Sequence, residues 1–224
     1  GTPLPSIVGN RYGCLGANSN TLGPSEIQSI VTQKALVGTA TITSETKLRI
    51  IVATFAVHPM SCRTESGILK LSQLAALCAM FTYWRGSLIV HFEMTCSSAT
   101  RGKVLFSITP KGGAEMKGAE ALHLGMGAEF DIGTAVSRKF EVPFVSTDDW
   151  ETLGDRGLMS AFEGVWDCPV AKIIVLHPIN SIGATTPSVD IRCYLSPGKD
   201  FEIRGRRHLG LRTSLRPLGL GRAQ

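Results

Sequence analysis

The feature that most constrains the fold is a pair of closely spaced segments in which apolar and polar residues alternate. In residues 84–95, Leu88, Val90, Phe92 and Met94 fall on one side, behind an aromatic cluster at residues 81–84. Residues 103–109 follow after a short turn and end before Pro110. A period of two is typical of strands with one buried face. The two segments therefore predict neighbouring antiparallel strands joined as a hairpin.

Similar segments occur along the rest of the chain. Residues 48–57 form a long strand candidate that His58-Pro59 ends, because proline cannot donate a hydrogen bond to a ladder. Further strands are predicted at 68–71, 140–144, 158–165, 172–177 (ended by Pro178) and 189–195. About eight strands with few helices predict an all-β fold, an eight-stranded antiparallel jelly-roll β-sandwich.

Two short helices are predicted between these strands. Residues 73–80 contain good helix formers behind Ser72, which suits the N-cap position. Residues 119–126 hold the second candidate, after a glycine-rich loop at 111–118. The polar residues 146–157 predict an exposed loop.

A length of 224 residues suits a single all-β domain with flanking segments. Residues 1–30 are rich in Gly, Pro, Ser and Asn, which predicts an extended N-terminal arm. The jelly-roll domain is expected at 31–203 and an arginine-rich C-terminal tail at 204–224.

The positive charge of the chain is concentrated in that tail. It contains Arg204, Arg206, Arg207, Arg212, Arg216 and Arg222 and no acidic residue, whereas the other 17 of the 23 basic residues nearly balance 18 acidic ones. Such asymmetry is typical of an arm that binds nucleic acid, a membrane surface or an acidic partner. No aromatic residue lies among these arginines, so base stacking is not expected.

The six cysteines do not form Cys-x-x-Cys pairs, and Cys78, Cys96 and Cys193 lie among apolar residues. They are interpreted as reduced core residues of a cytosolic protein, with disulfides left open by the even count. No apolar run reaches the roughly 18 residues that span a bilayer, and no signal peptide is visible. No membrane role is therefore predicted.

The sequence gives no positive indication of catalysis. His58 and Cys62 could form half of a zinc site, but no second pair stands nearby, and His91 is alone on its strand. The Gly-x-Ser-x-Gly nucleophile elbow is absent. We expect no enzyme activity, no catalytic residue, no cofactor and no metal.

Two stretches carry a resemblance to a known family. A short helix leads into Tyr83-Trp84-Arg85-Gly86-Ser87-Leu88, and residues 190–205 contain a last strand followed by Phe201-x-x-x-Gly205. This order resembles the coat proteins of picorna-like viruses over about residues 48–205. The second stretch is similar to the end of the small coat protein of comoviruses, which are plant viruses of the secovirid group.

The resemblance implies a structural subunit that assembles with other coat proteins into an icosahedral, pseudo-T=3 shell around a positive-sense single-stranded RNA. The protein would lie in the virion, and in the host cytoplasm before assembly. Gly1 and Gln224 would suit release from a polyprotein by cleavage between Gln and Gly, although a trimmed chain would look the same. Cleavage after Gln224 favours relatives with three separate coat proteins, such as cheraviruses.

Candidate sites follow from this hypothesis. Tyr83, Trp84 and Arg85 are the candidate subunit interface, since arginine and aromatic residues are enriched there. The structural alternative is that the aromatic residues fill the barrel end and Arg85 pairs with a carboxylate. The tail arginines are candidate contacts to RNA phosphates or to the outer surface, with a merely solvated terminus as the alternative.

Two other classes of function remain open on the sequence. The first is a jelly-roll binding module, such as a lectin or a trimeric ligand. The second, ranked third overall, is a cupin-type metal barrel.

Overall fold

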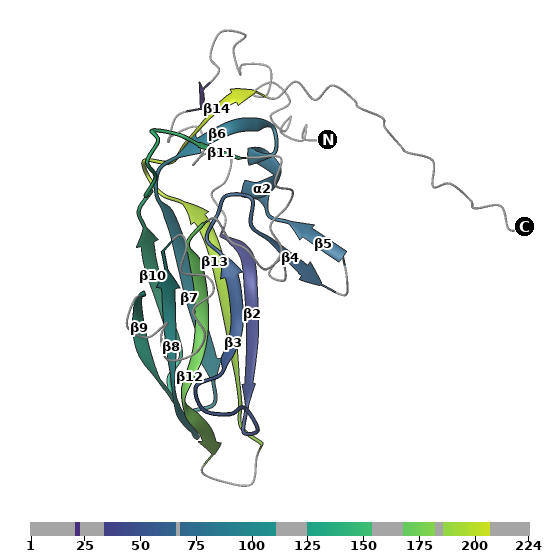
Figure 1. Cartoon of the computed structure of the whole chain (residues 1–224). Coiled ribbons are helices and arrows are strands. Elements are labelled where there is room, and N and C mark those ends of the chain that lie inside the picture. Colours follow the sequence, from purple (N-terminus) through teal and green to yellow (C-terminus); the bar gives the residue numbers. More distant parts are fainter. Residues whose placement is uncertain are drawn as a thin grey trace, which may run out of the picture.

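Two four-stranded antiparallel sheets pack face to face in the computed structural model (Figure 1), which describes residues 21–22, 34–65, 68–110, 125–153, 168–181 and 186–206. The first sheet has the order β10 (Val136–Val142), β7 (Leu88–Cys96), β13 (Ser188–Pro197) and β2 (Ala35–Thr43). The second has the order β3 (Ile51–Ala56), β12 (Val170–Ser181), β8 (Thr100–Thr109) and β9 (Met126–Ile132). Consecutive strands such as β7 and β8 therefore lie in different sheets, which confirms the predicted jelly-roll sandwich.

The hydrophobic core lies between the inner faces of the two sheets. Phe92 of β7 and Phe106 of β8 are fully buried, and their ring centroids are 5.2 Å apart. Phe92 also stacks on Phe130 of β9 at 4.8 Å, and Phe106 contacts Phe140 of β10 at 4.8 Å. Each such pair contributes about 0.5–1.5 kcal/mol beyond the area that it buries. These contacts connect all four strands and so join the sheets.

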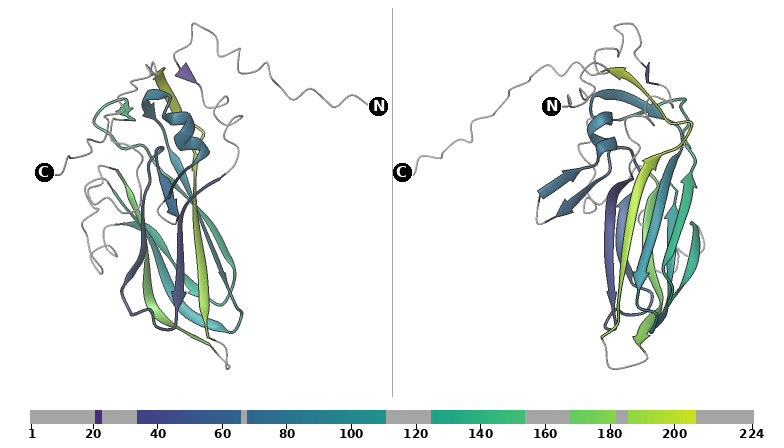
Figure 2. Two further views of the ribbon diagram at one scale, coloured as in Figure 1. Left: turned by 90° about the vertical axis from the view of Figure 1, so that its right-hand side faces the viewer. Right: turned by 180° about the vertical axis from the view of Figure 1, so that it is seen from behind.

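A third, smaller sheet closes one end of the sandwich. Its order is β1 (Thr21–Leu22), β14 (Glu202–Arg206), β6 (Phe81–Arg85) and β11 (Glu151–Thr152). The helix α2 (Gln73–Cys78) and the two-stranded hairpin of β4 (Cys62–Glu65) and β5 (Ile68–Leu71) lie at the same end (Figures 1 and 2). The hairpin projects sideways from the body of the molecule in these views. The closed end is therefore wider than the opposite one.

Several local predictions agree with the structure. The predicted strand at 48–57 is observed as β3, and those at 68–71 and 189–195 as β5 and β13. The side-chain oxygen of Ser72 accepts a hydrogen bond from the backbone N–H of Ala75 at 2.9 Å, which is the expected N-cap of α2. The predicted strand at 140–144 overlaps the end of the edge strand β10, which stops at Val142 before Pro143. The predicted strand at 158–165 and residues 119–124 of the predicted helix at 119–126 lie outside the described residues. The last two residues of that helix are wrong, because Gly125 is a bend and Met126 begins β9.

The predicted hairpin between residues 84–95 and 103–109 is wrong. β7 pairs with β10 and β13, whereas β8 pairs with β12 and β9 in the other sheet. Alternation shows that a strand has one buried face, but it does not identify the strand beside it. In a jelly roll a short turn can lead from one sheet to the other, as it does here.

Two other boundaries differ from the predictions. Pro178 does not end β12, because the strand passes it through register irregularities between Val175 and Asn180 that remove the need for a ladder hydrogen bond there. The strands β1, β2, β4, β9, β11 and β14 were not predicted, and β11 with the buried Leu153 lies within the predicted exposed loop at 146–157. Threonine and glycine in β2 and exposed Met, Gly and Glu residues in β9 give weak apolar alternation.

Five of the six cysteines lie within the described residues. Cys62, Cys78, Cys168 and Cys193 are buried and reduced, and Cys96 is reduced and partly exposed. Burial raises the pKa of the Cys78 and Cys193 thiols above the usual range, so both stay protonated. Where the structure describes the chain, no helix has the length and hydropathy that a membrane span requires.

Gly86 divides the predicted strand 84–95 into β6 and β7. Its φ is +102°, and a Cβ at this position would lie 2.3 Å from the carbonyl oxygen of Asp200. Only glycine tolerates both conditions. The bend lets β6 leave the first sheet and join the end sheet, so Gly86 positions Trp84 and Arg85 at the closed end.

Replacing Gly86 by alanine should destabilise the fold by at least about 2 kcal/mol, through backbone strain and the clash with Asp200. Urea unfolding of the purified chain measures this change. Ser137→Ala, at an exposed position of the edge strand β10, is the control and should change the free energy of unfolding by less than about 0.5 kcal/mol. Equal stability of the two variants would contradict the strain argument.

Candidate functional site

Trp84 fills the closed end of the sandwich. Only 5% of its surface is exposed. Its ring meets His58 and Phe144 edge-on, at 5.4 and 5.2 Å between centroids, and Phe201 at 5.9 Å. The indole N–H is buried without a hydrogen-bond partner in the part of the chain that the structure describes. Trp84 therefore acts mainly as a packing residue between the end sheet and the core.

Arg85 points outward from the next position of β6. Its Nε and a terminal nitrogen both lie close to Glu202 Oε2, at 2.8 and 2.7 Å, because Glu202 is the directly opposite residue of β14. The guanidinium also lies over the ring of Trp150, 4.5 Å from its centroid. Both partners are partly exposed, so the ion pair is worth less than about 1 kcal/mol.

The geometry of Trp84 and Arg85 matches the structural alternative stated above. The tryptophan fills the barrel end, and the arginine is paired with a carboxylate of the same chain. Glu202 and Trp150 were not identified from the sequence. The opposite charges of Arg85 and Glu202, 117 residues apart, could have been paired only if the β6–β14 register had been known.

Tyr83 and Arg85 are both exposed, with 41% of the Tyr83 surface and 45% of the Arg85 side chain accessible, whereas Trp84 between them is buried. Met80 and Leu71, at the same end of the molecule, are 43% and 51% exposed. Leu71 ends β5, Met80 lies between α2 and β6, and Tyr83 belongs to β6. Of the predicted interface residues, Tyr83 and Arg85 thus have surface available to another molecule, and Arg85 already pairs with Glu202.

The first of the predicted tail arginines belong to the folded domain. Arg204 is exposed on β14 and lies 5.9 Å from the Trp150 ring, and the strand extends to Arg206. Both arginines thus belong to a strand of the end sheet. Arg207, Arg212, Arg216 and Arg222 lie outside the described residues.

A polar clamp holds the bend between β6 and β7. The backbone N–H of Ser87 donates to Asp200 Oδ1 at 3.0 Å, and its hydroxyl contacts both Asp200 and Glu141. Partial burial raises the pKa of Asp200, but the hydrogen bonds from Ser87 outweigh this and lower it. The clamp was not predicted, since three separate segments contribute to it.

His58 has a structural position. Its Nδ1 accepts a hydrogen bond from the backbone N–H of Met60 at 3.1 Å, and its ring packs on Trp84. No cluster of three or more potential metal ligands is found among the described residues.

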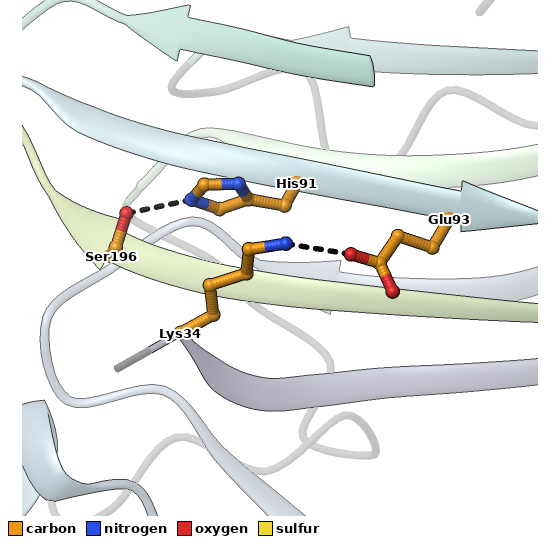
Figure 3. A network of polar contacts seen from close by, with 4 residues as sticks. All are labelled: Lys34, His91, Glu93 and Ser196. Atoms are coloured by element: carbon orange, nitrogen blue, oxygen red, sulfur yellow. Dashed lines mark hydrogen bonds and ion pairs between the residues drawn. The ribbon is translucent and has the colours of Figure 1, made fainter. Parts of the chain in front are cut away.

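His91 belongs to a polar network on the outer face of the first sheet (Figure 3). Its Nε2 lies 2.8 Å from Ser196 Oγ, while Lys34 pairs with Glu93 at 2.7 Å on the same face. Lys139 of β10 is directly opposite His91. Burial lowers the pKa of His91, the positive charges of Lys34 and Lys139 lower it further, and Glu93 opposes them. The neutral ring is therefore favoured in the folded chain.

This pKa shift predicts a loss of stability in acid. The unfolded chain has the higher His91 pKa, near the usual 6.5, so the contribution is complete above that pH and declines as the pH falls toward the folded-state pKa. The free energy of unfolding, measured with urea, should differ less between pH 7.5 and pH 5.5 for His91→Gln than for the unmodified chain. The exposed His177→Gln variant should keep the full difference. Equal pH dependence in all three proteins would rule out His91 as the cause.

The chain matches a protein family over most of its length. Residues 11–165 match the model of the picornavirus capsid protein family. Genome polyproteins of Cosavirus A and of Mengo encephalomyocarditis virus are 29% and 30% identical over 131 and 135 residues, each covering 58% of this chain. The polyprotein of avian encephalomyelitis virus is 27% identical over 155 residues, or 66% of the chain. The aligned regions span only 6–7% of these polyproteins.

Solved structures show the same fold. The structure of deformed wing virus, a honeybee pathogen, has a TM-score of 0.68 at 20% identity, covering 99% of this chain and 58% of that one. The Triatoma virus empty capsid has a TM-score of 0.68 at 15% identity, with 93% and 85% covered. A marine algae virus of the order Picornavirales gives 0.67 at 18%, with 92% and 87% covered. With the family match, these likenesses lead to one assignment: the chain belongs to the picornavirus capsid protein family.

Proposed function

We propose that this chain is a structural subunit that assembles with other coat proteins into an icosahedral, pseudo-T=3 shell around a positive-sense single-stranded RNA. The observation that carries the proposal is the jelly-roll sandwich together with the family match over residues 11–165. The family is structural, so the chain is not an enzyme. A lectin-like module and a cupin-type barrel are not favoured.

The surface of the single chain supports an assembling role. Only 18% of its residues are charged, against the roughly 25% usual for soluble domains. Exposed large apolar side chains occur at the closed end, among them Leu71, Met80 and Tyr83. Such residues suit contacts that are buried by neighbouring subunits and repeated by symmetry.

The finer parts of the hypothesis are proposals as well. Assignment to the plant secovirids rests on the motif at residues 83–88 and on Phe201-x-x-x-Gly205, whereas the polyproteins matched above come from Cosavirus A and from encephalomyelitis and encephalomyocarditis viruses. Within the predicted arm at residues 1–30, Thr21–Leu22 pair with β14 of the same chain, and we propose that the rest of the arm orders on a neighbouring subunit. The protein would be a virion component that passes through the host cytoplasm before assembly.

For the predicted interface, we propose that Tyr83 makes the contact, while Trp84 holds β6 from its buried face and Arg85 pairs with Glu202 on the exposed face. After co-expression with the companion coat proteins of the same polyprotein, sedimentation and negative-stain imaging should show closed particles. Tyr83→Ala should lower their yield at least about tenfold, equivalent to about 1.4 kcal/mol, with little change in the stability of the free chain. Met126→Ala removes a similarly exposed side chain from the edge strand β9 and should assemble normally. Normal assembly of Tyr83→Ala would exclude this residue from the interface.

For the tail, we propose contact with RNA phosphates. Deletion of residues 207–224 removes four arginines and leaves β14 complete. If these arginines bind phosphate, the slope of log binding constant against log salt should become shallower by about 3, since each contact to single-stranded nucleic acid contributes about 0.7. Filter binding of single-stranded RNA at several salt concentrations measures this slope, and replacing the four arginines by lysine should preserve it. An unchanged slope in the deletion variant would favour an outward-facing or solvated tail.

A further inference from the structure

The hairpin of β4 and β5 has a basic hollow at its base. The hollow measures about 260 Å³ and lies between the hairpin, the start of β2 and the residues before α2. Among the described residues that line it, Lys34, Arg63 and Lys70 are charged, and all three are cations, with Lys34 also paired to Glu93. Leu71, half exposed, also lines the hollow. The hollow therefore combines positive charge with an apolar side chain.

The register of the hairpin places two of these cations against each other. Arg63 of β4 and Lys70 of β5 are directly opposite residues of the antiparallel pair. Like charges at such positions are destabilising, and an anion that contacts both relieves the repulsion. Both side chains also have interactions within the chain, so such an anion adds to their contacts. Moreover, a two-stranded ribbon has little stability of its own, so this hairpin gains from a partner.

A complementary surface lies in the loop before β11. Asp148 and Asp149 are adjacent and exposed, and neither makes an ion pair with any residue that the structure describes. Val145, three residues earlier, has 72% of its surface exposed. Two carboxylates beside an exposed valine match a hollow that offers cations beside an exposed leucine.

The two surfaces lie on opposite sides of the same end of the sandwich. The β4–β5 hairpin points to one side, and the segment that joins β10 to β11 lies on the other, in the front and rear views (Figures 1 and 2). A contact between different surfaces of identical subunits is head-to-tail, and it closes into a ring when the rotation fits. This placement suits such a contact and excludes pairing of the two surfaces within one chain.

We propose that the basic hollow at the base of the β4–β5 hairpin receives the Asp148–Asp149 loop of a second copy of this chain. The carboxylates lie between Lys34, Arg63 and Lys70, and Val145 packs against Leu71 of the neighbour. The contact repeats around a symmetric ring of copies. The inference rests on the proposed role in a shell, because it names one of the contacts that would build it.

Charge reversal tests the contact in particles assembled from the full chain and its companion coat proteins. Lys70→Glu and Asp149→Lys should each lower the fraction of chain that sediments as particles at least tenfold. The double variant, Lys70→Glu with Asp149→Lys, should recover most of the assembly. Lys47 is an exposed cation in the loop between β2 and β3, at the opposite end of the sandwich, so Lys47→Glu should not rescue Asp149→Lys.

A cysteine cross-link gives an independent measurement if a reversed variant folds poorly, which urea unfolding of each chain reveals. Chains carrying Lys70→Cys and chains carrying Asp149→Cys, assembled together, should give a disulfide-linked dimer on a non-reducing gel. Neither variant alone should do so.

The outcomes separate the contact from the proposed function. If the unmodified chain forms no particles with its companions, the proposed function fails. If the unmodified chain assembles, Lys70→Glu and Asp149→Lys also assemble normally and no cross-link forms, the contact alone is overturned. Reversals that block assembly without mutual rescue mean that a different chain fills the hollow, which also overturns it. If Lys70→Glu forms normal particles that package less RNA, the hollow binds RNA phosphate, and the proposed contact is overturned as well.

Discussion

The structure depends on the burial of two inner sheet faces against each other. Phe92 and Phe106 come from β7 and β8, consecutive strands in different sheets, and each contacts a further ring, Phe130 or Phe140. Because side chains alternate across a strand, burying these rings fixes which residues face outward. The outward positions of His91 and Glu93 on β7 follow from that alternation. A shift of one residue in any of these strands would exchange the core for the surface.

The closed end shows a different balance of forces. Here a single bend at Gly86 takes the chain out of the first sheet, and Ser87 and Asp200 hold that bend by hydrogen bonds. Trp84 covers the end of the core, where its ring contacts those of Phe144, Phe201 and His58. Its buried indole N–H lacks a partner in the described chain, which is a cost that its large buried area offsets. These interactions hold β6 in place, and as a consequence Tyr83 and Arg85 of β6 are exposed to solvent.

The sequence was sufficient for the fold class but not for the strand pairing. Alternation in residues 88–94 identified a half-buried strand correctly, and Ser72 correctly marked the start of α2. It could not show that β7 and β8 lie in different sheets, because local pattern reports burial and not the partner. The site has the same limit. Tyr83, Trp84 and Arg85 were singled out as a group, yet only the three-dimensional register separates a buried Trp84, a paired Arg85 and an exposed Tyr83.

The charges of the single chain explain why its contacts with neighbours can be selective. The ion pairs within the described residues, such as Arg85 with Glu202 and Lys34 with Glu93, join exposed or partly exposed groups and so add little to stability. What they do is neutralise the positions that they join. Asp148 and Asp149 form no ion pair within the described residues, and three cations line the hollow beside β5, one of them the Lys34 that pairs with Glu93. A surface with little net charge and two such local concentrations on opposite sides disfavours contacts in which like charges meet, and it leaves the orientation that joins the two. Charge then selects the register of the contact, while the exposed apolar residues beside it supply most of the binding energy.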